Sequence, residues 1–223
     1  MGQAVSTSAL WGAKQLLGAN SKLDNFEAII DSAFMPSGLG PMLLSPDFSK
    51  CLDELCLDSN LPLLQLAELQ DHRVGGVMTP LIQRSETVAD ALRVVLMFNC
   101  RHAEPLYWTV SMRGDHAALT AWFDRPAELS ITQVERICVL GVFQLVAGFK
   151  SALGEAFQPT LIRIKPACSE TEWPSHFMGV PIESNAPKTE LLLARSCLTL
   201  PTRRKRHLSD AGDRGAAGVR HLR

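Results

Sequence analysis

The chain has 223 residues, which suits one large domain or one domain with tails. Hydrophobic residues make up 46% and charged residues 20%, so a core can form and general disorder is excluded. Residues 203–223 contain seven Arg or Lys and two Asp, so their net charge is +5. The net charge of the whole chain is −1, so residues 1–202 have a net charge of −6. A negative body lacks the surplus of basic side chains that binding to nucleic-acid phosphates requires.

Residues 1–22 are small and polar with scattered apolar positions, and they are predicted to be flexible. Asp24 and Glu27 have the spacing of a helix-capping box, and Pro36 ends the helix that they begin. The first twenty residues lack the basic start and apolar stretch of a secretory signal. A cytoplasmic protein is therefore expected.

A second helix is predicted to begin at Pro46, with its apolar residues at helical spacing: Phe48, Leu52 and Leu55. A third short apolar segment covers residues 61–69. Two glycines and a proline predict a loop over residues 72–80. Thr87 can cap the next helix, which extends to about Cys100 and carries one clean apolar stripe: Val88, Ala91, Leu92, Val95 and Leu96.

The apolar period then changes from 3.6 to 2, which is typical of strands. Residues 106–112 and 116–123 alternate in this way, and Gly114–Asp115 between them is a tight-turn signal. The pattern predicts an antiparallel hairpin. In its first strand one face would carry Leu106, Trp108, Val110 and Met112; in its second, Ala117, Leu119, Ala121 and Phe123.

The longest helix is predicted over residues 131–153. Ser130 and Gln133 form a capping box before it, and Gly154 follows as a C-terminal cap. Apolar residues cover almost every face of this segment, so it is expected at the centre of the domain. Its uncharged part, residues 137–149, is thirteen residues long, short of the roughly 20 that cross a bilayer, so no membrane association is expected.

Two further strands are predicted at residues 161–165 and 189–195, separated by a loop rich in Pro, Ser and Trp. The fold class is therefore α+β: a small antiparallel sheet, made of the hairpin plus two further strands, packed against helices with one long buried helix. The chain divides into a flexible segment (1–22), a folded domain (23–202) and a basic disordered tail (203–223). The tail is too short to hold two packed helices with a core of their own.

The six cysteines include no C-x-x-C pair and no His/Cys cluster with zinc spacing, so free thiols and no metal site are expected. The sequence also lacks phosphate-binding loops, a G-x-S-x-G elbow and an H-E-x-x-H motif. No cofactor is expected. A catalytic hypothesis depends on His102 and Glu104 alone, as an acid/base pair; these residues are more typical of a solvated helix end, where His suits the helix dipole.

A pocket is predicted between the sheet and the long helix. Tyr107 and Trp122 lie on the hairpin faces opposite to Trp108 and Phe123, so they can line a pocket or simply belong to the sheet surface. Gln144 interrupts the buried helix and needs a hydrogen-bond partner, either a ligand or a protein group. The predicted ligand-binding residues are Phe98, His102, Tyr107, Trp122 and Gln144.

Three stretches together resemble one known family. Residues 85–92 (SETVADAL) resemble its "s-x-T-hydrophobic-x-x-A-L" helix start. Residues 153–159 (LGEAFQP) resemble its "l-l-G-x-x-x-x-P" segment, and residues 176–182 (HFMGVPI) its "x-F-G-x-P-V" segment. The family is the AraC/XylS transcription regulators, and the likeness is to the arabinose-binding-type N-terminal domain of the ornithine-utilisation-regulator-like branch, over about residues 25–202.

The resemblance implies a domain that senses a small-molecule effector, forms a homodimer or pairs with a full-length regulator, and is not an enzyme. Met178 and Glu183 depart from the family's third segment. The family's helix-turn-helix region has no counterpart after Pro201, so the interpretation is a truncated or frame-shifted regulator without direct DNA binding. A standalone enzyme and a protein-interaction module with an exposed apolar patch remain the alternatives.

Overall fold

The computed structural model describes residues 4–6, 42–56, 61–69, 78–102, 106–123, 128–165 and 173–202. This description excludes the predicted helix after Asp24, the basic tail and Cys168. It also excludes the side chain of Cys100. Within it, the main elements are α3 (Ser45–Leu55), α4 (Leu61–Glu68), α5 (Met78–Arg84), α6 (Val88–His102), β3 (Leu106–Arg113), β4 (His116–Phe123), α7 (Ile131–Leu153), β5 (Pro159–Arg163), β6 (His176–Phe177), β7 (Val180–Glu183) and β8 (Glu190–Ala194).

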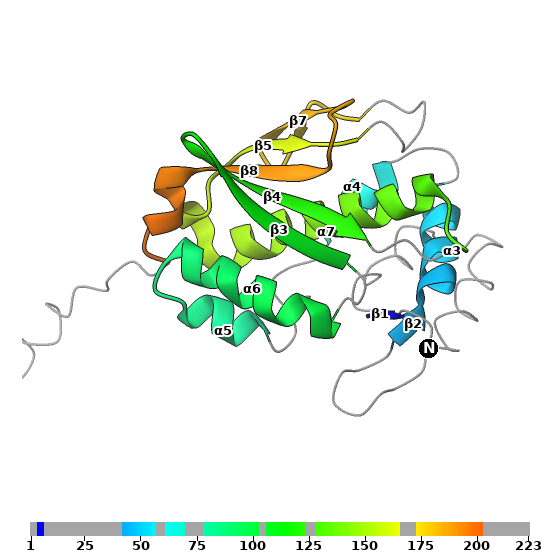
Figure 1. The fold of residues 1–223 in the computed structure, drawn as a ribbon, viewed down its shortest axis with the longest axis horizontal. Helices are drawn as coiled ribbons and strands as arrows, with labels where there is room; N and C mark the ends of the chain where they lie inside the picture. Colours follow the sequence, from blue (N-terminus) through cyan, green and yellow to red (C-terminus); the bar gives the residue numbers. More distant parts are fainter. Residues whose placement is uncertain are drawn as a thin grey trace, which may run out of the picture.

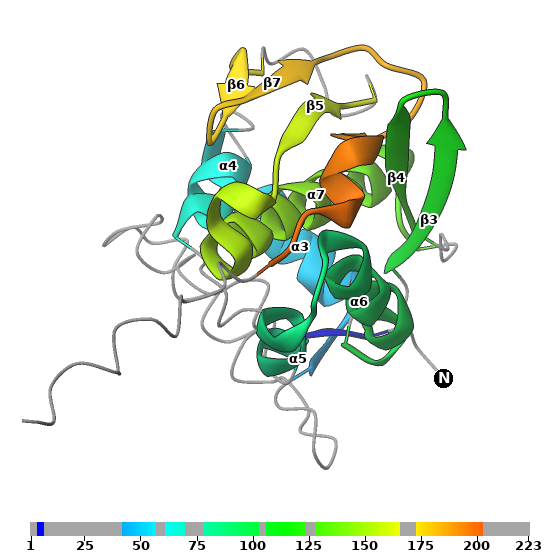
Figure 2. The same ribbon diagram turned by 90° about the vertical axis from the view of Figure 1, so that its left-hand side faces the viewer.

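Six strands form one curved sheet in the order β3-β4-β8-β5-β7-β6. All neighbours are antiparallel except β5 and β7, which are parallel. The described helices lie on one side of this sheet, with α7 running beneath its middle (Figures 1 and 2). This is an α+β fold, as the sequence predicts.

The long helix α7 has the predicted boundaries. The Ser130 hydroxyl accepts a hydrogen bond from the Gln133 N–H (3.2 Å), and the Gln133 side chain accepts one from the Ser130 N–H (2.9 Å). Fourteen of its residues are buried. The hairpin packs on it so closely that a Cβ on Gly141 would lie 2.6 Å from Leu106 Cδ2, so a glycine is what allows this approach.

The hairpin β3–β4 also has the predicted register, with Gly114 (φ +57°) at the first turn position. On β4 the predicted apolar face is buried throughout: Ala117, Leu119, Ala121 and Phe123. On β3 the predicted face is divided, because Leu106 is buried against α7 whereas Val110 and Met112, beyond the helix, are exposed.

The sheet is larger than predicted. Two short strands, β6 and β7, stand where a loop was expected, and they join through Met178 and Gly179, whose φ angles are both positive (48° and 79°). Two successive positive φ angles are the requirement of a type I′ hairpin turn. The extra Met178 that departs from the family segment is therefore a turn residue.

Two other predictions need correction. The loop predicted up to Pro80 is helical from Met78, because proline is tolerated in the first turn of a helix. Residues Ala4–Ser6, in the segment predicted to be flexible, form β1, which pairs antiparallel with β2 (Met42–Leu44).

Candidate functional site

The structure distributes the five predicted ligand-binding residues over three places. Tyr107 and Trp122 face each other across the hairpin and stack, with ring centroids 4.5 Å apart. Strand alternation directs both rings to the sheet face away from α7, because Trp108 lies next to Gly141 on the helix side. Trp122 is 44% exposed, so this pair forms a surface feature of the hairpin.

Gln144 lies on the other side of the sheet. It is half-buried on α7, on the same helix face as Gly141, and it has an interaction partner. Phe98 and His102 belong to α6, but their side chains, and the whole of Glu104, lie outside the described residues. The structure therefore brings Tyr107 and Trp122 together and separates them from Gln144, and the His102/Glu104 hypothesis stays a prediction.

The outer face of the sheet carries a buried carboxylate. The Glu190 side chain is 2% exposed and accepts hydrogen bonds from Arg113 (3.0 Å), Arg163 (3.2 Å) and the Thr120 hydroxyl (3.3 Å). Arg163 also pairs with Glu183 at 2.9 Å. Interaction with Glu183 and Glu190 raises the pKa of Arg163 above its usual value. Each charge in this network has a partner, so it serves to fasten β3, β5, β7 and β8 together.

A second kind of feature lies at the C-terminal end of α7. Two hollows, of about 560 and 520 Å³, flank the turn formed by residues 154–156. The larger one, called here the α7-end groove, is lined by Leu153, Gly154, Glu155, Ala156, Gln158, Leu200, Pro201 and Thr202. Its volume lies within the roughly 300–1,000 Å³ of typical ligand pockets.

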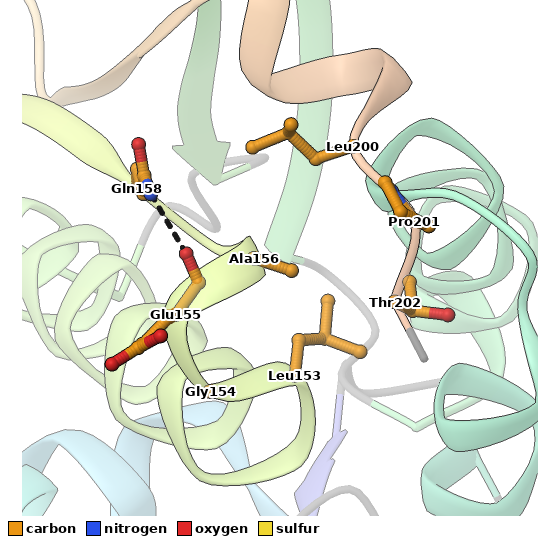
Figure 3. A pocket seen from close by; sticks show the side chains of 8 residues that line it. All are labelled: Leu153, Gly154, Glu155, Ala156, Gln158, Leu200, Pro201 and Thr202. Atoms are coloured by element: carbon orange, nitrogen blue, oxygen red, sulfur yellow. Dashed lines mark hydrogen bonds between the residues drawn. The ribbon is translucent and has the colours of Figure 1, made fainter. Parts of the chain in front are cut away.

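Apolar side chains form the inside of the α7-end groove. Leu153 and Ala156 point into it from one side and Leu200 lies across from them, while the Glu155 carboxylate points away from Leu200 and Pro201 (Figure 3). The Gln158 side-chain amide donates to the Glu155 carbonyl (2.9 Å). The groove thus offers an apolar interior with a few polar groups at its border, which is the usual chemistry of a small-molecule site.

Residues 200–202 connect the α7-end groove to α6. The Val88 N–H donates to the Leu200 carbonyl (3.1 Å), the Thr202 N–H donates to the Glu86 carbonyl (3.1 Å), and the Thr202 hydroxyl bonds to the Ser85 carbonyl. The Leu200 carbonyl thereby satisfies one of the backbone N–H groups that every helix N-terminus leaves free. One wall of the groove is therefore formed by residues 200–202, the last residues that the structure describes.

The buried thiol of Cys197 holds the other side of the same segment. It contacts the Ala156 carbonyl and the Gln158 N–H, each at 3.4 Å, and so joins residues 195–199 to the floor of the groove. Burial raises the pKa of this thiol, so it stays protonated and neutral at physiological pH. Cys51, Cys56 and Cys138 are also buried and free.

In the part of the chain that the structure describes, no group of three or more His, Cys, Asp or Glu side chains is placed to hold a metal ion. Among the described helices, α7 alone is long and apolar enough to cross a bilayer, and 67% of its most apolar window is buried. A helix covered in this way is typical of the core of a folded domain.

No protein-family model matches the chain, and no curated protein does. Among solved structures, the fold is similar to the crystal structure of the transcriptional regulator CdpR from Pseudomonas aeruginosa, with a TM-score of 0.53 and 14% sequence identity. The similarity covers 82% of this chain and 58% of the regulator's chain. The chain thus has a fold found in a transcriptional regulator, and it spans less than two thirds of that regulator's length.

Sequence reasoning missed the α7-end groove for a physical reason. Its residues come from positions 153–158 and 200–202. Taken alone, the first set has the pattern of a helix end followed by a turn, and the second has the pattern of a chain that leaves a domain. Residues 153–159 do contribute to the family resemblance, but there they mark only the end of a helix. Only the pairing of residues 200–202 with residues 86–88 places the two sets opposite each other.

Proposed function

We propose that this chain is the effector-sensing domain of a transcription regulator of the AraC/XylS type, and that the α7-end groove binds the effector. The observation that carries the proposal is the groove itself, because one wall is the end of the central helix and the other is formed by residues 200–202. The CdpR-like fold and the family-like segments at residues 85–92, 153–159 and 176–182 support the regulatory class. Binding without catalysis is part of the proposal.

The mechanism follows from the position of the groove. A ligand shifts an equilibrium only when it binds one conformation better than another. An effector that contacts Leu153, Ala156 and Leu200 together favours the conformation in which residues 200–202 are held against α6. The shift toward this conformation would be transmitted along the backbone to the part of the protein beyond residue 202.

The partners of this proposal are a small molecule and another protein chain. The apolar interior suits a molecule of moderate size with one apolar part, and Gln158 at its border suits a polar group on it. A second copy or a full-length regulator of the same type is the protein partner. Residues 1–202 have a net charge of −6, so direct contact with DNA by this chain is not part of the proposal. Function in the cytoplasm fits this assignment.

A thermal-shift screen against amino acids, fatty acids and sugars tests the proposal. A ligand at 100 times its dissociation constant adds about 2.7 kcal/mol to stability, which raises Tm by about 5–10 °C in a domain of this size. The Ala156→Phe variant, which fills the groove, should lose this shift.

Control variants separate this site from the predicted one between sheet and helix. Gln144→Ala and Trp122→Ala should retain the ligand-induced shift, because both residues lie outside the α7-end groove. If Ala156→Phe keeps full affinity and Gln144→Ala loses it, the effector binds at the sheet–helix site instead. If no compound of these classes stabilises the chain, the sensing function is contradicted for all of them.

A further inference from the structure

The outer face of the sheet carries an aromatic pair that the proposed function does not use. The described helices lie on the other side of the sheet, so none of them covers this face (Figures 1 and 2). Tyr107 stacks on one face of the Trp122 indole, with an angle of 21° between the ring planes. Trp122 is nevertheless 44% exposed. The other face of its indole is therefore available to a second flat ring.

A guanidinium group lies on the same face, further along β4. Arg113 stands beside the hairpin turn, but its side chain extends over the outer face to Glu190, which pairs with Thr120 in the sheet. The Arg113 guanidinium and the Thr120 hydroxyl both donate to the Glu190 carboxylate, at 3.0 and 3.3 Å. Thr120 and Trp122 are alternate residues of one strand, so their Cα atoms lie about 7 Å apart. The positive charge thus lies near the aromatic pair but not against it.

Arg113 retains the capacity to bind an anion. Its side chain is 45% exposed, whereas the Glu190 side chain beneath it is 2% exposed. A guanidinium has five N–H donors, and the hydrogen bond to Glu190 uses one of them. The exposed carboxylate of this network, Glu183, pairs with Arg163 and belongs to β7, which β8 and β5 separate from β4. It therefore lies away from the aromatic pair.

A second cation lies at the level of the indole. The Ala121 N–H donates to the Thr189 carbonyl (3.1 Å), which extends the register of β4 and β8 by one step and brings the neighbouring Lys188 beside Trp122. Lys188 is exposed. Among the described residues, no carboxylate forms an ion pair with it. The aromatic pair is therefore accompanied by two accessible positive charges.

We propose that this surface, called here the Trp122 platform (Tyr107, Arg113, Trp122 and Lys188), binds a purine nucleoside monophosphate. The purine ring stacks on the open face of Trp122, since aromatic side chains bind nucleobases by stacking whatever the base. The phosphate binds the Arg113 guanidinium, whose planar donors suit phosphate oxygens, and Lys188 adds a second positive charge. The ribose supplies the spacer that the separation of Trp122 from Arg113 requires between a flat ring and an anion.

Charge favours a mononucleotide over a nucleic acid. Residues 1–202 have a net charge of −6, so the chain lacks the surplus of basic residues that a row of phosphates requires. Two local cations match the one or two negative charges of a single phosphate. The site goes beyond the proposed effector function and does not depend on it, because no residue of the Trp122 platform lines the α7-end groove.

Calorimetric titration of the full chain with AMP, adenosine and inorganic phosphate tests the proposal. AMP should bind saturably, and adenosine and phosphate should each bind at least about ten-fold more weakly, because each lacks one of the two contacts. Trp122→Ala should weaken AMP binding about 5- to 150-fold, and Trp122→Phe, which keeps a flat ring, should retain most of it. Lys188→Gln should weaken AMP about two- to five-fold and leave adenosine unchanged.

Three control variants should bind AMP like the unmodified chain. Met112→Ala removes a side chain that is 48% exposed on the opposite face of the same hairpin. Lys50→Gln removes the charge of a lysine that is 64% exposed on α3. Ala156→Phe fills the α7-end groove, so it separates this site from the effector site.

Four results would overturn the proposal. They are the absence of saturable AMP binding, adenosine that binds as tightly as AMP, full AMP affinity in Trp122→Ala, and loss of AMP binding in Ala156→Phe. A single-stranded adenine oligonucleotide that binds much more tightly than AMP would overturn it in favour of a nucleic-acid surface. Failure of the effector screen would leave it in place, because that screen contains no nucleotide.

Discussion

Gly141 and Gly148, two helical turns apart on α7, offer a matched pair of substitutions. Around Gly148 no atom lies within 4 Å of an added Cβ, whereas at Gly141 the Cβ would lie 2.6 Å from Leu106 Cδ2 and 3.6 Å from the Trp108 ring. Alanine in a helix interior is favoured over glycine by about 1 kcal/mol. Gly148→Ala should therefore raise the free energy of unfolding by about 1 kcal/mol, or Tm by about 2–4 °C.

Gly141→Ala gains the same backbone term but overfills the contact between α7 and the hairpin. Overpacking of a core costs about 1–3 kcal/mol. The net effect should lie between about 0 and −2 kcal/mol, and the two alanine variants should differ by about 1–3 kcal/mol in urea unfolding at constant m-value.

A double-mutant cycle identifies the cause. Leu106→Val removes the Cδ2 atom, so in that background the cost of Gly141→Ala should shrink by about 1 kcal/mol or more. The reasoning would be refuted if both alanine variants were equally stabilised, because the hairpin would then not depend on a glycine for its approach to α7.

Three further predictions concern caps, charges and thiols. Ser130→Ala should lower the free energy of unfolding by about 1 kcal/mol in urea, because it removes half of the capping box of α7. Glu190→Gln should cost about 1–3 kcal/mol, since it removes the charge of a buried carboxylate that accepts hydrogen bonds from two guanidinium groups. Glu183→Gln, at a side chain that is 48% exposed, should cost less than about 1 kcal/mol, and equal costs would contradict the network. Burial raises the pKa of Cys51 and of Cys56 from 9.0 to about 12, so these thiols release their protons at a lower pH in the unfolded chain than in the folded one. The free energy of unfolding should therefore be unaffected below pH 9 and should fall as pH rises from 9 toward 12. In urea unfolding, the Cys51→Ala/Cys56→Ala variant should show a shallower fall over the same pH range.

The elements with strong local signals could be predicted from the sequence. The helix Ile131–Leu153 is bounded by a capping box and a glycine, and the hairpin by its period of 2 and its Gly-Asp turn. In these places the local pattern and the tertiary packing agree, so boundaries were correct to within a residue.

The short strands could not be predicted because nothing local distinguishes them. β6 is two residues long, and β7 contains Pro181 at its second position. What makes these residues strands is the pairing of β7 with β5, a contact between segments about twenty residues apart. Because β5 and β7 are parallel, the chain must also return to the level at which β5 starts before β7 begins. The spacing of apolar residues in the sequence gives no signal of such a return.

The candidate site was less predictable than the fold. Tyr107 and Trp122 lie on the face opposite to Trp108, as expected, and there they stack on each other with Trp122 44% exposed; their part in binding a ligand stays a prediction. Conversely, the α7-end groove depends on hydrogen bonds between residues 86–88 and residues 200–202. A site that two distant chain segments form through backbone contacts leaves no residue pattern in either of them.

Amide hydrogen exchange, with the best compound from the screen at saturation, tests effector binding in the α7-end groove most directly. The account predicts slower exchange in residues 153–158 and 200–202 and at the Val88 amide, which donates to the Leu200 carbonyl. Slower exchange confined to residues 106–123 of the hairpin, with 200–202 unchanged, would contradict it.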